Sequence, residues 1–494
     1  MERSIHGDII VLGGGGAGFC AAMRAAQLGK RVILLEKAPS VGGSAAMARG
    51  LGAVGARDQR NSPKGAFTIA QMLHDWMEQT NYLANFALIH EYLRHSGETV
   101  DWLQALGCRI DYVGTVQPKH AHSPFQTYFI WDTYKAGEMR RLIRRVEEGG
   151  GQVLLRTAAE ELIVDSGRVA GVWARDEQGR FAVYGRAVIA CTGGYGANEE
   201  MVLRATRGVK VNAINTGFQT GDGIRMAMDI GCGTENPDAI ELHGCDVPCD
   251  KLSRASIGRH GNELSRLTGF PGVLWLNRLG QRFVNEGVWE DISYTGNAVF
   301  RQGSEYYILL DQTMADALTE KGARALGLDT DLRGLDPDTP WTDFPAQLRE
   351  GLTCGVVHRG DSLSALAGSA GMDAAALSQT VADYNALCAA GRDDMYGKDP
   401  AYLHAYGAGP YYLIEGRANQ LCSLGGLRIN TAMQALRPDG RPIPGLYAAG
   451  CDASGGLVNN AYVSYEGVTL GWACTSGKLA AEHAADHIEK ELTS

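Results

Sequence analysis

The stretch that decides the fold runs from Asp8 to Glu36 and reads DIIVLGGGGAGFCAAMRAAQLGKRVILLE. It opens with apolar residues typical of a short buried strand, and a glycine-rich turn follows over 13–18. Residues 19–28 show helical spacing of apolar side chains, and Gly29 ends that pattern. A second apolar run over 31–36 predicts another strand. Strand, turn, helix and strand predict a βαβ unit, and therefore an α/β fold.

The glycine spacing in this unit indicates a dinucleotide site. Gly13, Gly15 and Gly18 fit G-x-G-x-x-G, and Glu36 ends the second strand at the offset of an acid that binds a ribose hydroxyl. Glycines let the backbone approach a pyrophosphate, and a helix N-terminus offers free N–H groups and a positive dipole end. The alternative is a glycine-rich turn that only packs against its neighbours and binds no ligand. Four features of this unit agree with a dinucleotide site, so we favour that interpretation.

Composition excludes several other classes. The chain has 494 residues, of which 45% are hydrophobic and 21% charged, as in an ordinary folded protein of two to four domains. A net charge of -10 without a basic block argues against nucleic acid as a partner. No apolar run approaches the ~20 residues of a membrane span, and no signal peptide is visible, so we expect a cytoplasmic enzyme. The 11 cysteines include no Cys-x-x-Cys, so no metal site is predicted.

The distribution of glycine and of secondary-structure signals indicates the domain layout. The 65 glycines gather at separate segments, as expected where main chain holds an extended ligand. Residues 225–355 lack the βαβ rhythm and predict an inserted substrate domain, here called the cap. The first domain would then comprise 1–224 and 356–494. Helical patterns return over 362–387, and a last helix is expected from about 469 to 490.

Further motifs resemble one flavoprotein family, over nearly the whole chain. They are Glu36–Ser44 (EKAPSVGGS), Thr192–Gly194, Thr220–Gly223, Arg282–Glu286 (RFVNE), Gly425–Asn430 and Pro442–Gly450. Together they resemble the family of fumarate reductase, urocanate reductase and the 3-ketosteroid dehydrogenases. The resemblance implies a Rossmann-like FAD-binding domain with an inserted α+β cap, and substrate held between cap and isoalloxazine. It also implies that the last helix points its N-terminus at the flavin, where a positive dipole end stabilises anionic reduced flavin.

The same resemblance predicts the residues that hold FAD. Ser44 stands about where some membrane-bound relatives carry a His that binds FAD covalently, so non-covalent FAD is expected. The expected cofactor-binding residues are Gly13, Gly15, Gly16, Ala17, Gly18, Glu36, Lys37, Gly42, Gly43, Ser44, Ala158, Thr192, Gly193, Asp222, Gly450, Asp452, Thr469 and Leu470.

The residues at the family's catalytic positions argue against a dicarboxylate substrate. Fumarate reduction requires cations that clamp two carboxylates and an Arg that supplies a proton. Trp289 and Glu290 stand where the resemblance places the proton-donor Arg, Cys422 replaces a clamping His, and the run up to Tyr462 replaces a second Arg. Of these positions only a His in the cap is retained, as His243.

The segment Tyr462-Val-Ser464 resembles the steroid-desaturating branch, which places a Tyr just before the last helix. A neutral phenol suits proton transfer beside a polarised enone, and Ser464 would relay the proton. The alternative is that Tyr462 packs beneath the flavin while Tyr465 is exposed. His120 and His122 fall in a segment that often lines this pocket.

The remaining candidates also have alternatives. His243 is either a substrate ligand or a cap residue satisfied by backbone. Glu290 either selects a substrate that carries a positive or hydrogen-bond-donating group, or is solvated on the cap surface. Trp289 either forms an apolar wall over the substrate or packs within the cap. Cys422 is expected near the substrate from its motif position.

The predicted function is that of an FAD-dependent oxidoreductase acting on a CH–CH or C=C bond beside an activating carbonyl, of the enone or ketosteroid type. Hydride would pass between flavin N5 and the β-carbon, with a proton moved by Tyr462. A reductase of a small unsaturated acid, urocanate- or acrylate-like, and a flavoprotein subunit without its own activity are the alternatives. No second dinucleotide fingerprint and no haem-attachment motif occur, so a separate electron donor or acceptor is expected as partner.

Overall fold

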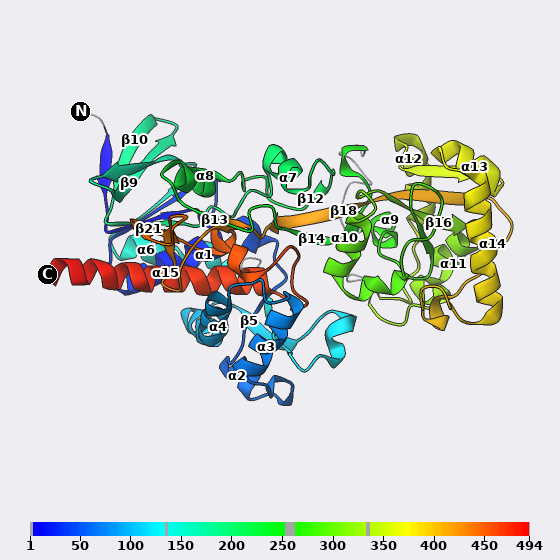
Figure 1. Ribbon diagram of the computed structural model, residues 1–494, viewed down its shortest axis with the longest axis horizontal. Coiled ribbons are helices and arrows are strands. Elements are labelled where there is room, and N and C mark those ends of the chain that lie inside the picture. Colours follow the sequence, from blue (N-terminus) through cyan, green and yellow to red (C-terminus); the bar gives the residue numbers. More distant parts are fainter. Residues whose placement is uncertain (1–2, 134–136, 252–261, 332–335, 494) are drawn as a thin grey trace. The chain divides into compact units, whose positions relative to one another are not determined.

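The computed structural model describes residues 3–133, 137–251, 262–331 and 336–493, which form two compact units (Figure 1). The first unit comprises Met1–Gly208, Ile214–Glu241 and Leu421–Ser494. The second comprises Val209–Ala213 and Leu242–Gln420. The expected cap over 225–355 overlaps the second unit, whose main segment begins at Leu242 and continues to Gln420. It continues further because helix α13 (Leu363–Ala370) packs against β17 (Val357–Gly360) and α14 (Ala374–Ala390) packs against α13.

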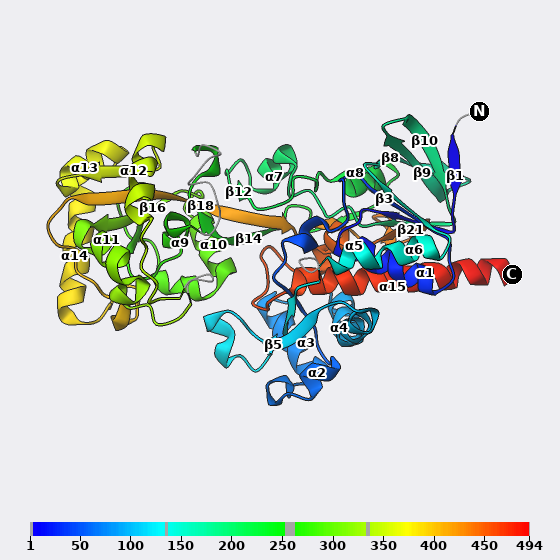
Figure 2. The same cartoon turned by 180° about the vertical axis from the view of Figure 1, so that it is seen from behind.

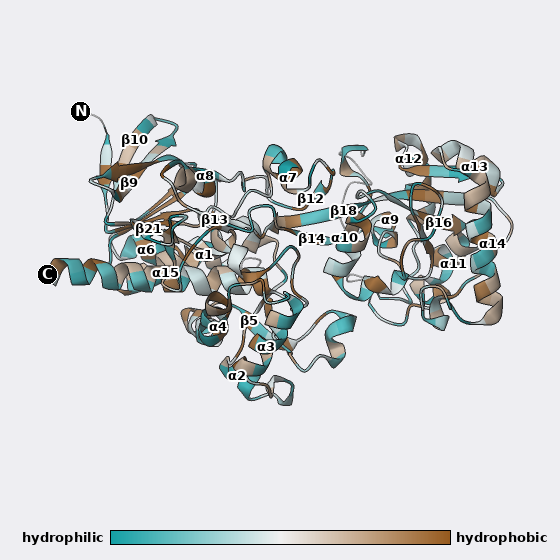
Figure 3. Ribbon diagram, viewed as in Figure 1, coloured by the Kyte–Doolittle hydropathy of each residue, from teal (hydrophilic) through white to brown (hydrophobic). Residues whose placement is uncertain are grey.

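A six-stranded sheet is the core of the first unit. Its strand order is β20-β21-β11-β2-β3-β7, and all neighbours are parallel except the edge strand β20. The bounds are β20 Gln434–Leu436, β21 Pro442–Ala448, β11 Ala187–Ala190, β2 Ile9–Leu12, β3 Val32–Glu36 and β7 Gln152–Leu155. Every residue of β2, β3 and β11 is buried, as expected of parallel strands covered on both faces, and the hydrophobic colouring of Figure 3 follows these strands.

Two helices from opposite ends of the sequence pack together against this sheet. Helix α1 (Gly16–Gln27) follows the glycine turn, and α15 (Val468–Thr493) is the predicted last helix. Figure 2 shows them side by side, and α1 is buried along most of its length. The predicted βαβ unit is therefore confirmed, and α15 packs against its helix, α1.

Smaller sheets and helices complete the first unit. A four-stranded sheet has the order β1 (Ser4–His6), β10 (Gly179–Tyr184), β9 (Arg168–Asp176) and β8 (Ala158–Asp165). A three-stranded sheet has the order β4 (Gly50–Gly52), β6 (Tyr128–Trp131) and β5 (Ile110–Gly114). In a two-stranded sheet, β13 (Thr234–Glu235) pairs with β19 (Gly426–Leu427). The helices are α2 (Arg57–Arg60), α3 (Ile69–Gln79), α4 (Phe86–Leu106), α5 (Glu138–Leu142), α6 (Arg144–Glu148), α7 (Glu199–Ala205) and α8 (Asp222–Asp229).

The second unit is built on the long strand β18 (Tyr411–Ser423). β18 pairs with β12 (Asn212–Ala213), β16 (Tyr306–Asp311), β14 (Ile240–Asp246) and β17 (Val357–Gly360), and β15 (Leu274–Leu276) extends the sheet. Its other helices are α9 (Glu263–Leu267), α10 (Ile292–Phe300), α11 (Gln312–Lys321) and α12 (Phe344–Cys354). Among the described residues of the whole chain, no helix is long and apolar enough to span a membrane, and no cluster of three metal-ligating side chains occurs.

Candidate active site

The predicted cofactor residues gather at one edge of the parallel sheet. β2, β3, β11 and β21 run parallel, with Leu12 paired to Leu35 and Ala190 paired to both Leu12 and Ala448, so their carboxyl ends meet. In open α/β sheets this is the edge where ligands bind. The turns that follow these strands, together with the starts of β8 and α15, carry Gly13, Gly15, Gly42, Gly43, Ser44, Ala158, Thr192, Gly193, Gly450, Thr469 and Leu470.

Two glycines of the fingerprint are required by the fold itself. Gly13 has a φ of +98°, and a Cβ there would lie 2.4 Å from the carbonyl oxygen of Cys191. A Cβ on Gly18 would lie 1.8 Å from the carbonyl oxygen of Gly13. Both distances are far below van der Waals contact, so neither position accepts a side chain, and the turn can pass tightly between β2 and α1.

The middle glycine leaves space where a pyrophosphate would bind. A Cβ on Gly15 would meet nothing nearer than the Cα of Gly43, at 3.9 Å. Gly15 is also the N-cap of α1, no side chain caps this helix, and its first turn carries no acidic residue. The free N–H groups and the positive helix end therefore remain available to an anion, and these residues fit FAD.

Glu36 is held at the end of β3 by backbone donors. The N–H of Gly14 donates to its Oε2 at 2.6 Å, and the N–H of Ala38 donates to its Oε1 at 2.7 Å. Each carboxylate oxygen has a second lone pair, which suits a ribose hydroxyl. The next residue, Lys37, pairs with Asp222 at 2.7 Å, so these two predicted residues hold each other.

Asp452 fixes the turn that carries Thr192. It is fully buried and accepts the N–H groups of Thr192 at 2.6 Å and Gly194 at 2.8 Å. The Thr192 hydroxyl also donates to it, at 2.9 Å. Burial raises the pKa of Asp452, although these hydrogen bonds act in the opposite direction. The structure thus gives Asp452 the task of positioning the cofactor turn.

A connected polar cluster lies at the first turn of α15, here called the Tyr462 cluster: Tyr462, Thr469, Glu241 and Cys422. The backbone N–H of Thr469 donates to the Tyr462 hydroxyl at 3.1 Å, and the Thr469 hydroxyl donates to Glu241 Oε2 at 3.0 Å. The Cys422 thiol donates to the same oxygen at 3.3 Å. Sequence analysis predicted Tyr462, Thr469 and Cys422, and the structure brings them together around Glu241.

Both weak acids of this cluster are held protonated. Burial, and next the Glu241 carboxylate, raise the pKa of Tyr462 well above its ordinary value. The pKa of Cys422 is also raised, by its interaction with Cys451 first, then by burial and by Glu241. A phenol whose oxygen already accepts an N–H still has its own O–H to donate. Tyr462 is therefore neutral at physiological pH and has an O–H group with which to donate a hydrogen bond.

Sequence reasoning missed Glu241. It is 3% exposed and lies on β14, two residues before the predicted His243. The available signal was an acid between two apolar residues, Ile240 and Leu242, because a buried carboxylate is retained only with partners. Two of its partners come from residues 422 and 469, which no local pattern connects to residue 241.

Ser464 belongs to a second cluster, with His120 and Glu466. His120 Nε2 lies 3.1 Å from the Ser464 hydroxyl, and His120 Nδ1 lies 3.2 Å from Glu466. Glu466 also accepts the backbone N–H groups of Val116 and Gln117, each at 2.9 Å. His120, predicted only from its segment, is thus the partner of Ser464.

Tyr465 is buried, contrary to the alternative in which it was the exposed tyrosine. It is 4% exposed, its hydroxyl bonds to Asp75, and its ring lies 5.1 Å from that of Trp76. The ring of Tyr465 packs against Trp76 of α3, which explains its burial. His122, by contrast, is exposed.

His243, Trp289 and Glu290 belong to the second unit. His243 lies on β14 and is partly exposed. Trp289 and Glu290 end a short 3-10 helix, Glu286–Glu290, in which Trp289 is half-buried and Glu290 is exposed. The exposure of Glu290 supports its solvated alternative.

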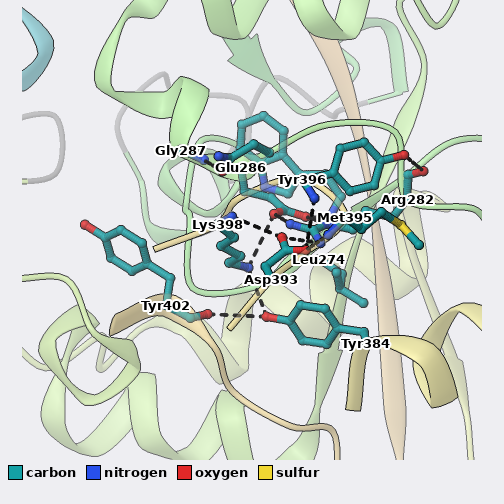
Figure 4. Close-up of polar contacts among 12 residues, drawn as sticks. Leu274, Arg282, Glu286, Gly287, Tyr384, Asp393, Met395, Tyr396, Lys398 and Tyr402 are labelled. Atoms are coloured by element: carbon teal, nitrogen blue, oxygen red, sulfur yellow. Dashed lines mark hydrogen bonds and ion pairs between the residues drawn. The ribbon is translucent and has the colours of Figure 1, made fainter. Parts of the chain in front are cut away.

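The RFVNE motif forms a buried charge cluster in the second unit (Figure 4). Arg282 contacts Glu286 at 2.6 Å and Asp393 at 2.7 Å, and Lys398 lies 3.5 Å from Glu286. Lys398 also donates to the Tyr384 hydroxyl at 3.1 Å. Two cations thus meet two carboxylates, and burial lowers the pKa of Lys398. The motif thus forms a paired charge cluster inside the second unit, where removing one partner would leave a buried charge unpaired.

Comparison with known proteins agrees with this geometry. The chain matches the FAD binding domain family over residues 8–464, and it belongs to that family. It is 30% identical to the vinyl phenol reductase of Lactiplantibacillus plantarum, over 98% of this chain and 97% of that protein. It is 28% identical to a fumarate reductase (cytochrome) of Shewanella frigidimarina, over 98% of this chain and 78% of that protein.

A solved structure shares the fold. The 3-ketosteroid delta1-dehydrogenase from Sterolibacterium denitrificans, in complex with 1,4-androstadiene-3,17-dione, matches with a TM-score of 0.77 at 21% identity, covering 98% of this chain and 100% of that one. The predicted flavoprotein fold, FAD cofactor and enzyme class are confirmed. The chain is an FAD-dependent oxidoreductase of the fumarate reductase and ketosteroid dehydrogenase family, acting on C=C bonds.

Proposed function

We propose that the enzyme acts on an uncharged alkene conjugated to a hydroxylated aromatic ring or to a carbonyl, with a vinyl phenol as the preferred form. The observation that carries this proposal is the composition of the Tyr462 cluster. A neutral thiol, Cys422, and a neutral phenol, Tyr462, stand where the family resemblance expects cationic clamps, and the Glu241 carboxylate belongs to the same cluster. The similarity to a vinyl phenol reductase along nearly the full length of both chains supports the same substrate class.

Electrostatics disfavours the small dicarboxylates. Glu241 is buried, so its charge is poorly screened by solvent. At 4 Å and an effective dielectric constant near 20, two like charges repel by about 4 kcal/mol. A dianion placed beside Tyr462 would meet this repulsion without the arginines that offset it in a fumarate reductase. Urocanate- and acrylate-like acids carry a single carboxylate, so Glu241 repels them as well, but less strongly than it repels a dianion.

The residues of the cluster then have defined tasks. FAD, when bound, supplies or accepts the hydride. Tyr462 donates a proton to the alkene carbon that does not receive the hydride, and Thr469 fixes the phenol through its backbone N–H. Glu36, Gly15 and Thr192 hold the cofactor, non-covalently as the sequence predicts. A separate electron donor or acceptor and a cytoplasmic location remain predictions from the sequence.

The test is turnover of matched alkenes by the purified holoprotein. Reduced methyl viologen supplies electrons anaerobically, and chromatography identifies the products from 4-vinylphenol, a 3-ketosteroid enone, urocanate and fumarate. We expect 4-ethylphenol from 4-vinylphenol and no succinate from fumarate. Succinate as the fastest product would refute the proposal, and turnover of the steroid alone would move the assignment to the enone class.

A further inference from the structure

The chemistry of a vinyl phenol requires more than a proton donor. An enone is polarised by its carbonyl and accepts hydride at the β-carbon, whereas the vinyl group of 4-vinylphenol is electron-rich. Removing the phenolic proton while adding a proton to the terminal vinyl carbon converts the substrate into a quinone methide. That isomer is electron-poor at its exocyclic carbon and accepts hydride there. An acid and a base must therefore act at opposite ends of one substrate.

The Tyr462 cluster contains both groups. Thr469 connects them, because its backbone N–H bonds to the Tyr462 hydroxyl at 3.1 Å while its side-chain hydroxyl bonds to Glu241 at 3.0 Å. The donor and the carboxylate are thus fixed by the two polar groups of one residue, in the first turn of α15. Cys422 holds the carboxylate from another direction, through its thiol.

We infer that Glu241 is the general base that takes the phenolic proton of the substrate while Tyr462 protonates the terminal vinyl carbon. This inference rests on the proposed function and names its chemistry. The phenolic O–H bond breaks with its proton passing to the Glu241 carboxylate, and the freed electron pair moves through the ring. The terminal carbon forms a C–H bond with the proton of Tyr462. The isomerisation consumes no oxidant or reductant.

The remaining step restores both residues. The exocyclic carbon next to the ring receives the hydride, which the reduced cofactor supplies, and the ring becomes aromatic again as a phenolate. This phenolate takes its proton back from Glu241, and Tyr462 regains one from water. The sum is one hydride and one proton added across the double bond. Burial first, and then the Glu241 charge, raise the pKa of Tyr462, so the phenol carries its proton when the substrate binds.

Because the isomerisation is redox-neutral, it is measurable without turnover. Oxidised holoprotein is incubated with 4-vinylphenol in heavy water, and proton NMR follows loss of the terminal vinyl signals as deuterium enters. We expect exchange with the wild type and a decrease of roughly 10²-fold or more in Glu241→Gln, the range of general acid–base catalysis. Glu241→Asp should retain part of the rate. Glu200→Gln, which alters an exposed acid of α7, should exchange like the wild type.

FAD content and circular dichroism of each variant show that it is folded. 4-Methoxystyrene lacks the phenolic proton and should neither exchange nor be reduced. Exchange in Glu241→Gln at the wild-type rate, or reduction of 4-methoxystyrene as fast as 4-vinylphenol, would overturn the inference and leave the proposed function standing. Reduction of the enone with no exchange or reduction of 4-vinylphenol would instead overturn the substrate assignment itself.

Discussion

Replacing Tyr462 by Phe removes the proposed proton donor and keeps the ring. The substitution also leaves the Thr469 N–H, which has no partner within the first turn of α15, without its acceptor. We expect this loss to cost about 1–3 kcal/mol of stability. A domain of 150–250 residues loses about 2–4 °C in Tm per kcal/mol, and a larger unit loses less, so Tm falls by a few degrees while the protein stays folded. Turnover should fall far more, by about 10²–10⁴-fold.

The assay is single-turnover reoxidation of the dithionite-reduced protein by 4-vinylphenol. A loss of 10²–10⁴-fold corresponds to about 2.7–5.5 kcal/mol in the activation barrier. Tyr465→Phe is the matched control, because Tyr465 bonds to Asp75 outside the Tyr462 cluster, and its rate should be near the wild type. Ser464→Ala should slow the reoxidation less than Tyr462→Phe does. A normal rate in Tyr462→Phe beside a crippled Tyr465→Phe would refute the assignment of the proton donor.

The cofactor edge and the charge cluster of the second unit give four further predictions. Acid should release FAD into solution, and flavin that precipitates with the protein would show a covalent bond. Glu36→Ala should weaken FAD binding by about 1–3 kcal/mol, or roughly 5–150-fold in Kd, as fluorescence titration of the apoprotein would show. Glu286→Gln should cost about 3–5 kcal/mol in a denaturant titration because it leaves Arg282 partly unpaired in the core, whereas Asp338→Asn in an exposed pair should leave the midpoint unchanged. Burial raises the pKa of Asp393, but hydrogen bonds and the Arg282 charge outweigh this effect and lower the pKa overall. The contribution of Asp393 to the free energy of unfolding should therefore be present above pH ~4 and be lost as the pH falls further.

Much of the cofactor edge could be predicted because its chemistry depends on local spacing. Gly13, Gly18 and Glu36 lie within one βαβ unit, and the steric limits on the glycines operate over a few residues. Asp452 was expected to touch the cofactor, and that stays a prediction. Its carboxylate also holds a turn that begins 260 residues earlier in the chain, which no local pattern shows.

The catalytic clusters could be predicted only in part, because their partners are distant in sequence. Tyr462 and Ser464 were predicted as a pair, but the structure gives them different partners. Ser464 bonds to His120, which is 344 residues away, and the partner of Thr469 is Glu241, 228 residues away. Such contacts depend on how distant segments of the first unit pack together, and a single sequence without long-range information does not encode them locally.

The central claim is that this flavoenzyme acts on an uncharged conjugated alkene and rejects a dicarboxylate. It is tested most directly by mixing the anaerobically reduced holoprotein with 4-vinylphenol or with fumarate, and following the return of the visible absorption of oxidised flavin. We predict rapid, stoichiometric reoxidation by 4-vinylphenol and none by millimolar fumarate. Rapid reoxidation by fumarate, with 4-vinylphenol inert, would contradict the account.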